Sequence, residues 1–384
     1  MASVVIAGAG PAGLAAAAEL SRRGHECLVL ERGAAVGTSW RNHYEGLHLH
    51  TASFLSALPG LRFPRREGLW VARPALVGYL EEYARHHRLL VRCHAEVARV
   101  ERDGAGWSVV TAAGELLPAG AVVMATGQNR VPHVPDLPGL ERFGSRVRHS
   151  SEYRCAAPYA GRRVLVVGSG NSGAEIAAQI AGAGAERVWM AVRTPPSILP
   201  KLGWPLPNPA LGIAARHLPP ALVDVVARTL QRIALGDLGG HGLPPPAPGT
   251  YRRVLRGEAI PVVDVGIAAA VRSGSVVVVP PPARFEPSAV VLADGRRLEA
   301  DDVVLATGFR PGLEPLVGHL GVLDGGGRPV VDRWLEAVAA PGLHFIGYTS
   351  PLSGQLREIA RQARRLGRRA ASRMGTGGRA LAIR

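Results

Sequence analysis

The chain has 384 residues, of which 47% are hydrophobic and 20% are charged. This length exceeds what one hydrophobic core usually supports, so the sequence predicts two globular domains. The formal net charge of +15 raises the question of a nucleic-acid partner, but the arginines are scattered along the chain without interleaved aromatic residues. We therefore expect no nucleic-acid partner, and Lys201 as the single lysine points to a general preference for arginine.

The sequence also argues against a membrane protein and against a protein built on disulfide bonds. Residues 1–18 carry no charged side chain, but Gly and Pro interrupt them and they lack a basic start, so we expect neither a signal peptide nor a transmembrane segment. The three cysteines, Cys27, Cys93 and Cys155, lie far apart and form no CxxC pair. This spacing favours a cytoplasmic protein and excludes a flavoprotein that reduces a neighbouring disulfide.

A nucleotide-binding βαβ unit is predicted at the start of the chain. Residues 4–7 form an apolar run, residues 8–13 are Gly-Ala-Gly-Pro-Ala-Gly, residues 14–20 favour a helix, and the apolar run 28–30 ends in Glu31. In such a unit the first glycine permits the turn, the second lets the backbone approach a pyrophosphate, and the third allows the helix to pack on the strand. The carboxylate of Glu31 is then expected to accept hydrogen bonds from ribose hydroxyls.

Further elements follow before the middle of the chain. We expect an amphipathic helix at 76–89, short strands at 95–102 and 107–111, and an apolar strand at 121–127 that ends in Ala-Thr-Gly. The same tripeptide follows a second apolar strand at 302–305. Two such turns are expected where the chain crosses between domains or passes near a bound nucleotide.

The second βαβ unit repeats the plan with the opposite charge. Residues 164–167 are apolar, residues 168–173 are Gly-Ser-Gly-Asn-Ser-Gly, a helix continues through Ile180, and the strand 188–192 is followed by Arg193. A guanidinium binds the 2′-phosphate that a carboxylate would repel, so this site is predicted to prefer NADP to NAD. The alternative is that Arg193 is an exposed charge at the end of a strand.

The organisation of the chain follows from these two units. Glycine occupies 48 of 384 positions, so one bare Gly-x-Gly-x-x-Gly match is weak evidence, whereas two matches in strand-to-helix context are strong. We predict an α/β protein with two dinucleotide-binding, Rossmann-like domains. The FAD-binding domain comprises residues 1–158 and 301–384, and an NADP-binding domain of residues 159–300 is inserted in it.

Two helices complete the prediction. Within a Pro-rich region at 195–248, residues 222–235 form an apolar, amphipathic segment. Its face has four interpretations: a substrate lid, a dimer face, a membrane-touching surface, or ordinary core packing. A last helix is expected at about 355–369.

Several stretches resemble flavin-containing monooxygenases. They are residues 122–139, 168–177 and 306–309, together with three short segments between Gly236 and Gly274. Within that family the sequence is most similar to the YUCCA-type indole-3-pyruvate monooxygenases and their bacterial relatives, over almost the whole chain. The double glycine motif marks only the broad class of two-nucleotide flavoproteins, whereas the segments after Gly236 are more specific.

A class B monooxygenase motif, FxGxxxHxxx(Y/F/W), is present with one departure. Phe143, His149 and Tyr153 are in register, but Ser145 occupies the glycine position. The final tyrosine resembles the N- and S-oxygenating branch more than the tryptophan of Baeyer–Villiger enzymes. We interpret this segment as an interdomain hinge, with a catalytic role for His149 as the alternative.

The motifs and the resemblance together give a set of predicted cofactor-binding residues. For FAD they are Gly8, Gly10, Pro11, Ala12, Gly13, Glu31, Arg32, Thr38, Ser39, Trp40, Arg41, His50, Thr51, Val97, Ala125, Thr126, Gly127, Gly347, Gly354, Gln355 and Leu356. For NADPH they are Gly168, Ser169, Gly170, Asn171, Ser172, Gly173, Arg193, Thr194, Ala306, Thr307 and Gly308. Arg41 and His50 are also catalytic candidates, besides the alternative role of His149, and no metal ligand is predicted.

The function that the resemblance implies is an NADPH-dependent flavin monooxygenase. FAD takes a hydride from NADPH, reacts with O2, and delivers one oxygen atom to a small molecule through a C4a-hydroperoxyflavin. The implied substrate is a soft nitrogen or sulfur nucleophile or an aromatic 2-oxo acid, and a homodimer is compatible with the sequence. The alternatives are a flavin reductase that passes electrons to an acceptor without oxygenation, and a degenerate flavoprotein that binds nucleic acid or a protein.

Overall fold

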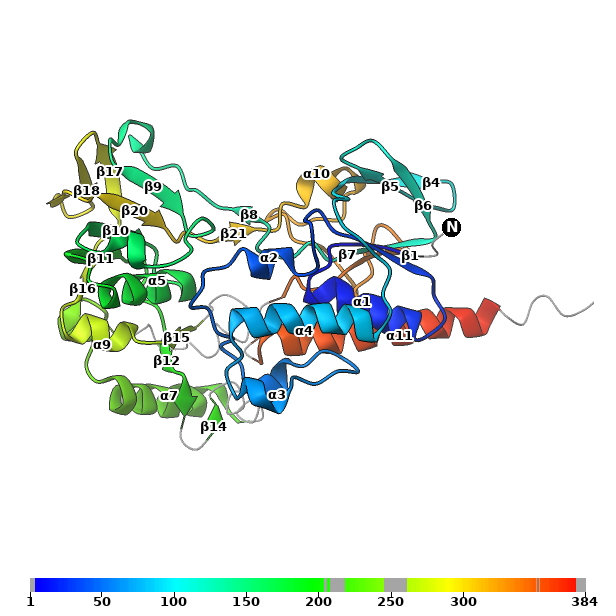
Figure 1. The fold of residues 1–384 in the computed structure, drawn as a ribbon, viewed down its shortest axis with the longest axis horizontal. Helices are drawn as coiled ribbons and strands as arrows, with labels where there is room; N and C mark the ends of the chain where they lie inside the picture. Colours follow the sequence, from blue (N-terminus) through cyan, green and yellow to red (C-terminus); the bar gives the residue numbers. More distant parts are fainter. Residues whose placement is uncertain are drawn as a thin grey trace, which may run out of the picture.

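Two parallel five-stranded sheets, each in its own domain, organise the chain (Figure 1). The computed structural model describes residues 4–203, 206–207, 218–244, 261–349, 351 and 353–377. Parts of the predicted Pro-rich region 195–248, at 204–205, 208–217 and 245–248, therefore lie outside the described residues. The prediction of an α/β protein with two Rossmann-like domains is confirmed.

The first sheet has the strand order β22-β7-β1-β2-β3, with all strands parallel. Its strands are β1 (Val4–Ala7), β2 (Cys27–Leu30), β3 (Val91–Arg92), β7 (Ala121–Met124) and β22 (Leu343–Phe345). Such strands are runs of Val, Ile and Leu because a parallel sheet is covered on both faces. Helices α1 (Pro11–Ser21) and α11 (Gln355–Gly377) pack against each other, and α4 (Arg73–His86) packs beside α1.

The second sheet has the strand order β16-β11-β10-β20-β9, also fully parallel. Its strands are β9 (Arg146–His149), β10 (Arg163–Val167), β11 (Arg187–Ala191), β16 (Val276–Val279) and β20 (Asp302–Leu305). Helix α5 (Asn171–Gly182) packs on β11, and α9 (Ile267–Arg272) packs between α5 and β16.

The second sheet extends beyond the range 159–300 predicted for the inserted domain. Its strands β9 and β20 come from residues 146–149 and 302–305. β20 pairs with β10 and β9 pairs with β20, so both strands are integral to this sheet. The sheet therefore includes one strand on each side of the predicted range.

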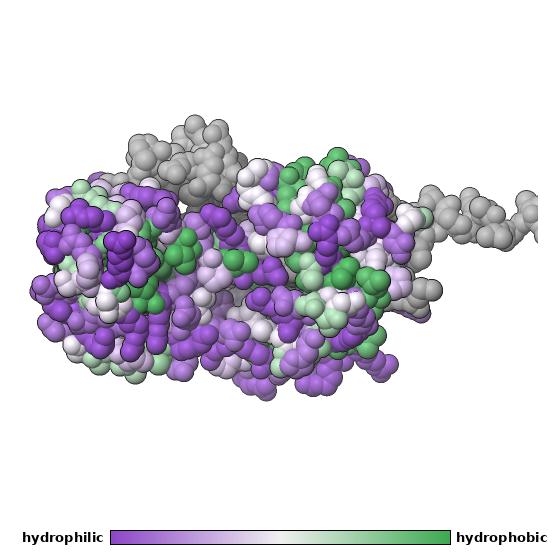
Figure 2. Space-filling view, turned by 90° about the horizontal axis from the view of Figure 1, so that it is seen from above, coloured by the Kyte–Doolittle hydropathy of each residue, from purple (hydrophilic) through white to green (hydrophobic). Residues whose placement is uncertain are grey.

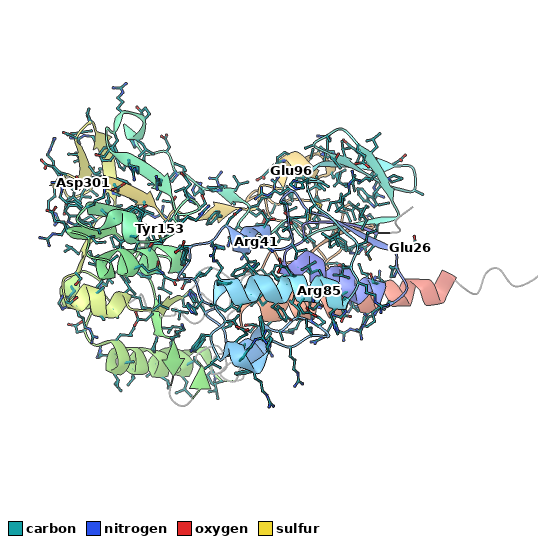
Figure 3. The ribbon with its side chains drawn as sticks, in the orientation of Figure 1. Glu26, Arg41, Arg85, Glu96, Tyr153 and Asp301 are labelled. Carbon is teal, nitrogen blue, oxygen red and sulfur yellow. The ribbon has the colours of Figure 1, made fainter. Side chains whose placement is uncertain are left out.

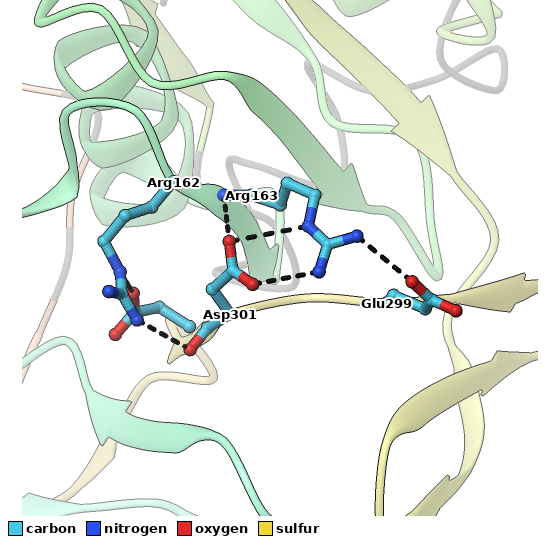
Figure 4. Close-up of polar contacts among 5 residues, drawn as sticks. Arg162, Arg163, Glu299 and Asp301 are labelled. Carbon is cyan, nitrogen blue, oxygen red and sulfur yellow. Dashed lines mark hydrogen bonds and ion pairs between the residues drawn. The ribbon is translucent and has the colours of Figure 1, made fainter.

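Strand β20 is fixed to β10 by charged side chains at the start of both strands (Figure 4). The Asp301 carboxylate accepts hydrogen bonds from the backbone N–H of Arg163 at 2.8 Å and from its guanidinium at 3.0 Å. The Arg162 guanidinium binds the buried carboxylate of Asp302. Arg163 also contacts Glu299 at 3.2 Å.

A two-stranded ribbon connects the domains. The chain leaves the first domain through β8 (Val131–Pro132) and returns through β21 (Phe309–Arg310), and these strands pair antiparallel. Additional bonds join Thr307 Oγ1 to the carbonyl oxygen of His133 at 2.5 Å, and the His133 N–H to the Gly308 oxygen at 2.9 Å. The return strand β21 directly follows one Ala-Thr-Gly turn, and three residues separate β8 from the other.

Smaller elements complete the domains. An antiparallel sheet of β4 (Val97–Asp103), β5 (Gly106–Thr111) and β6 (Leu116–Ala119) belongs to the first domain, and one of β17 (Pro282–Glu286), β18 (Ala289–Leu292) and β19 (Arg297–Leu298) belongs to the second. Strands β12 (Ile198–Pro200) and β15 (Val262–Asp264) pair in parallel. The remaining named elements are α2 (Thr38–Arg41), α3 (Ser53–Ser56), α10 (Glu314–Val317), β13 (Leu202–Gly203) and β14 (Leu206–Pro207). Polar residues cover most of the face in Figure 2.

The predicted helix at 222–235 is α7 (Pro220–Leu235). Its apolar residues Leu222, Val225, Val226 and Ile233 are exposed, at positions that share one helical face. Ordinary core packing therefore does not account for these four side chains. Within the described part of the chain, no helix is both long and apolar enough to cross a membrane.

Candidate active site

A cavity of about 470 Å³ lies where the first domain faces the second. Its walls come from the carboxyl ends of β1, β2 and β7, the start of α1, the start of α11, and the interdomain ribbon. Sixteen predicted cofactor-binding residues line it: Gly8, Gly10, Pro11, Ala12, Glu31, Arg32, Thr38, Ser39, Trp40, Val97, Ala125, Thr126, Gly127, Gly347, Gln355 and Leu356. Ligands of parallel α/β sheets bind in this position, at the carboxyl edge of the strands.

The three glycines of the first motif have different surroundings. A Cβ on Gly8, whose φ is +107°, would lie 2.6 Å from the carbonyl oxygen of Ala125, and one on Gly13 would lie 1.9 Å from the oxygen of Gly8. A Cβ on Gly10 would meet no protein atom within 4 Å, and Gly10 lines the cavity. Gly8 and Gly13 are therefore required by the protein itself, whereas Gly10 leaves space for a ligand that approaches the backbone.

Glu31 lines the same cavity from the end of β2. Its buried carboxylate accepts hydrogen bonds from the N–H groups of Ala9 and Gly33, both at 2.9 Å. These two bonds fix the carboxylate beside the glycine motif, and a carboxylate has further lone pairs that can accept bonds from a ribose.

The second glycine motif has the same geometry. Gly168 has a φ of +118°, and its Cβ would lie 2.4 Å from the oxygen of Ala306, while a Cβ on Gly173 would lie 2.0 Å from the oxygen of Gly168. A Cβ on Gly170 would again meet nothing within 4 Å. Each motif thus packs against one Ala-Thr-Gly turn, and the two domains contain equivalent nucleotide-binding cradles.

Arg193 lies just after β11, the second strand of the second βαβ unit. Its side chain is exposed, and within the described residues it forms no ion pair with a carboxylate. The Ser169 hydroxyl of the motif donates to the carbonyl oxygen of Thr194 at 3.3 Å, which joins the motif to the segment after β11. The guanidinium of Arg193 is therefore available to an anionic ligand.

Asn171 has a different role from the other residues of the second motif. Its side-chain amide donates to the oxygen of Pro261 at 3.1 Å, and its side-chain oxygen accepts from the N–H of Val263 at 2.9 Å. These bonds connect the start of α5 to β15, so the side chain of Asn171 organises protein structure.

Five of the predicted FAD-binding residues do not line the cavity. They are Gly13, Arg41, His50, Thr51 and Gly354. The guanidinium of Arg41 binds the Val36 oxygen at 3.0 Å and also binds the carboxylate of Glu81 on α4. The hydroxyl of Thr51 lies 2.7 Å from the hydroxyl of Ser56.

The catalytic candidate His50 contacts the second domain. Its Nε2 lies 3.3 Å from the buried carboxylate of Glu175 on α5, and that carboxylate accepts a hydrogen bond of 2.7 Å from the hydroxyl of Tyr44. The Tyr44 ring packs on Tyr153 with centroids 5.7 Å apart. Tyr153 and Arg41 come from the sides of the two domains that face each other (Figure 3), so this cluster joins the domains.

His149 is buried at the end of β9, and both ring nitrogens have partners. Its Nδ1 lies 3.1 Å from the donating N–H of Ser151, and its Nε2 lies 3.0 Å from the carbonyl oxygen of Gly308. Because Nδ1 accepts, Nε2 carries the proton and donates to Gly308, and burial lowers the pKa of the imidazole. The ring thus connects β9 to the turn through which the chain leaves the second domain, which favours the hinge interpretation.

Other cavity-lining residues were missed from the sequence. They are Ala7, Leu30, Asn42, His43, Ala95, Glu96, Gln128, Asn129, Arg130, Pro132, Ser151, Arg154, Phe309 and Ile359. The polar run 128–130 follows the Ala-Thr-Gly turn at the end of β7, and that position in a parallel sheet was a usable signal. Ser151 and Arg154 come from the second domain, and no pattern in the sequence indicated that they reach the first.

Two Gly-x-Gly-x-x-Gly cradles on two parallel sheets define a flavoprotein that binds two dinucleotides. Residues 5–198 match the family model described as pyridine nucleotide-disulphide oxidoreductase. The chain is 35% identical to indole-3-pyruvate monooxygenase YUCCA1 of Oryza sativa subsp. japonica, over 90% of this chain and 86% of that protein. It is 33% identical to the probable indole-3-pyruvate monooxygenase YUCCA7 of Arabidopsis thaliana, over 90% of this chain and 82% of that protein.

Solved structures agree with this class. A flavin-containing monooxygenase from Stenotrophomonas maltophilia is 28% identical in a double-mutant form, with a TM-score of 0.77 over 97% of this chain and 99% of that one. An NADP-bound steroid monooxygenase that is 20% identical shares the fold. Its TM-score is 0.75, over 98% of this chain and 86% of that one. The chain belongs to the flavin-containing monooxygenase family, with the YUCCA-type enzymes among its relatives. It is an FAD- and NADPH-dependent monooxygenase that uses O2 and a small-molecule substrate.

Proposed function

We propose that the first cradle holds FAD, that the second holds NADPH, and that the enzyme oxygenates an aromatic 2-oxo acid. The observation that carries the cofactor assignment is the charge at the end of the second strand of each unit, a buried carboxylate at Glu31 and an exposed guanidinium at Arg193. The carboxylate suits the hydroxyls of a ribose, and the guanidinium suits the 2′-phosphate of NADPH.

The residues around the first cradle fit FAD. The N-terminal turn of α1 presents backbone N–H groups without intrahelical partners to a pyrophosphate, and Gly10 leaves room for it. Gln355 and Leu356, at the start of α11, line the opposite wall of the cavity. When bound, the flavin supplies hydride acceptance and oxygen activation.

Several other residues of this chain hold the walls of the cavity in place and exclude water from it. The Thr126 N–H and hydroxyl contact the hydroxyl of Tyr348 at 3.2 and 2.8 Å, which fixes the first Ala-Thr-Gly turn under the cavity. Burial raises the pKa of Tyr348 to about 12, so its hydroxyl stays protonated. Trp40 lies between the cores of both domains and lines the cavity, where it excludes water.

The substrate class rests on two observations. The relatives with 33–35% identity are named as indole-3-pyruvate monooxygenases, and indole-3-pyruvate is an aromatic 2-oxo acid. The cationic side chain of Arg154 lines the cavity, forms no ion pair with a carboxylate among the described residues, and favours an anionic substrate.

Product analysis tests the substrate class. Oxygenation of a 2-oxo acid R-CO-COOH by O2, with NADPH and a proton, balances as R-COOH, CO2, NADP⁺ and water. We expect one CO2 and one shortened acid per NADPH when indole-3-pyruvate is added. NADPH consumption without an oxygenated product from either this acid or a thioether would instead support the flavin reductase alternative.

A nitrogen or sulfur nucleophile remains the second substrate class, favoured by Tyr153 at the end of the class B motif. Cytoplasmic location, a homodimer and the lack of a nucleic-acid partner are predictions from the sequence. The exposed apolar face of α7 supports a dimer, and sedimentation velocity of the purified protein measures it.

A further inference from the structure

The segment 44–50 of the first domain packs into the second domain. The buried side chains of Tyr44 and Leu47 belong to a hydrophobic core that contains residues of α5 and β10. The backbone N–H of Glu45 donates to the carbonyl oxygen of Arg154, which belongs to the second domain, at 2.8 Å. This short segment is therefore held by both a core and a backbone bond of the opposite domain.

Glu175 on α5 is the polar centre of this contact. Its buried carboxylate accepts a hydrogen bond of 2.7 Å from the hydroxyl of Tyr44, and the same oxygen lies 3.3 Å from Nε2 of His50. Burial, and then the charge of Glu175, raise the pKa of Tyr44, so its hydroxyl stays protonated and donates. Tyr44 and His50 come from opposite ends of the segment, and one carboxylate of the second domain therefore contacts both ends.

The segment and its partner lie next to the two proposed cofactor sites. Immediately before the segment, Trp40, Asn42 and His43 line the cavity proposed for FAD. Glu175 lies two residues after the second glycine motif, near the start of the helix whose N-terminus belongs to the proposed NADPH cradle. A shift of Tyr44 relative to Glu175 would therefore move the wall of one site relative to the other.

The first domain fixes the same stretch of chain by backbone contacts. The guanidinium of Arg73, at the start of α4, donates to the carbonyl oxygens of Arg41 and His43 at 2.7 and 2.8 Å. Near the other end, the N–H of Leu49 donates to the carbonyl oxygen of Val71 at 2.8 Å. A bond between the segment and the second domain therefore acts directly on a wall that is fixed to the first.

We propose that Glu175 is a positioning residue for hydride transfer from NADPH to FAD. It does not line the cavity, and it acts by holding Tyr44, which keeps the NADPH-binding domain in place against the wall of the flavin cavity. Reacting atoms must lie about 3–3.5 Å apart, and a misplacement of about 1 Å costs on the order of a hundredfold in rate. The inference rests on the proposed cofactor assignment and adds a residue outside both glycine motifs.

Stopped-flow reduction of the FAD-loaded enzyme by NADPH tests the proposal. Tyr44→Phe removes one hydroxyl and keeps the ring in the core. It is expected to lower the limiting rate of flavin reduction by about tenfold, and to change the Kd for NADPH by less than about twofold because the second cradle is intact. Glu175→Gln keeps a side-chain oxygen that accepts the bond from Tyr44, and is expected to retain most of the rate.

Hydrogen exchange of the oxidised, FAD-loaded enzyme without NADPH gives a readout that is independent of turnover. Because the N–H of Glu45 is bonded across the domain boundary, Tyr44→Phe is expected to speed its exchange by about threefold to tenfold. Tyr83→Phe is the matched control, since it removes a buried hydroxyl that donates to the Pro59 oxygen at 2.6 Å within the first domain. It is expected to leave the exchange of Glu45 and the rate of flavin reduction unchanged.

The proposal is overturned if Tyr44→Phe leaves the reduction rate or the exchange of Glu45 at the wild-type value, or if Tyr83→Phe slows reduction equally. A slower reduction that saturating NADPH restores would also overturn it, because the defect would then lie in binding. Wild-type enzyme that NADPH does not reduce would contradict the cofactor assignment and this inference with it. Equal, rapid reduction of wild type and Tyr44→Phe would contradict this inference alone.

Discussion

At the scale of single residues, the two glycine motifs separate positions that the protein needs from positions that a ligand needs. Gly8 and Gly13 have no space for a Cβ because backbone oxygens of the protein occupy it. Gly10 and Gly170 have this space, and nothing in the described structure fills it. The same three-glycine pattern thus contains two kinds of constraint, which substitutions can distinguish.

Gly10→Val is expected to fold but to lose FAD. Gly10 has a φ of −82° and a ψ of −177°, which valine adopts readily, and its side chain would enter the cavity. Flavin content, measured by the ratio of absorbance at 450 and 280 nm after gel filtration, is expected to fall by about tenfold or more. Gly13→Val provides the contrast, since a clash with the Gly8 oxygen should lower the melting temperature of the apoprotein. Full flavin retention by Gly10→Val would contradict the FAD assignment.

Arg193 is the residue that is expected to decide cofactor preference. Replacing its guanidinium in Arg193→Gln removes the charged contact to the 2′-phosphate, and KM for NADPH is expected to rise by about tenfold to a hundredfold while KM for NADH stays constant. Steady-state oxidation of both cofactors measures this, with Arg187→Gln at the opposite end of β11 as the control. Equal increases for NADPH and NADH would refute the phosphate contact.

At the scale of elements, the interdomain ribbon and its two flanking turns determine how the cradles face each other. Each Ala-Thr-Gly turn packs under one glycine motif, and each is followed within a few residues by one strand of the ribbon of β8 and β21. His149 reinforces this arrangement through Gly308. A residue from one domain can therefore line a cavity of the other, as Ser151 and Arg154 do.

His149→Gln is expected to test the hinge against a catalytic role. Loss of the contacts to Ser151 and Gly308 should lower the free energy of unfolding by about 1–3 kcal/mol, because buried partners lose their bonds. The pH profile of kcat is expected to keep its shape, since a hinge residue transfers no proton in turnover. Disappearance of an ionisation from that profile would favour the catalytic alternative.

At the scale of the whole molecule, burial of histidines couples stability to pH. Burial lowers the pKa values of His25, His43, His87 and His149, so the unfolded chain binds protons at these positions at higher pH than the folded chain does. The free energy of unfolding is therefore expected to fall as the pH drops below about 6.5, the ordinary pKa of histidine. Urea denaturation at pH 7.5 and 5.5 measures the loss, and constant stability across this window would contradict it.

The sequence predicted much of this architecture because the signals are local. The apolar run 4–7 followed by three spaced glycines specified a strand, a turn and a helix, and the structure has β1 and α1 there. Helix α4 begins at Arg73 rather than 76, since Pro74 stabilises a first helical turn that the apolar pattern does not mark. The sequence pattern predicts the Ala-Thr-Gly turns as crossings between domains or as neighbours of a nucleotide, and their packing against the glycine motifs is a feature of the tertiary structure.

Pairings between distant segments could not be read from such signals. Strands β9 and β20 belong to the second sheet, although both lie outside the predicted inserted domain. The side chain of Asn171 binds Val263 of β15, 92 residues away in sequence, and His50 contacts Glu175 in the other domain. The contact of Lys201 with Trp70 likewise joins two segments that no periodicity relates.

The amino-acid sequence alone determined the two nucleotide-binding units, their opposite terminal charges and the family resemblance, because each rests on residues within about one βαβ unit. Only the tertiary structure decided which residues share a cavity, where the inserted sheet ends, and which polar side chains are engaged in protein contacts. These depend on sheet register and domain packing, in which segments far apart along the chain become neighbours, and local propensity contains no information about that proximity.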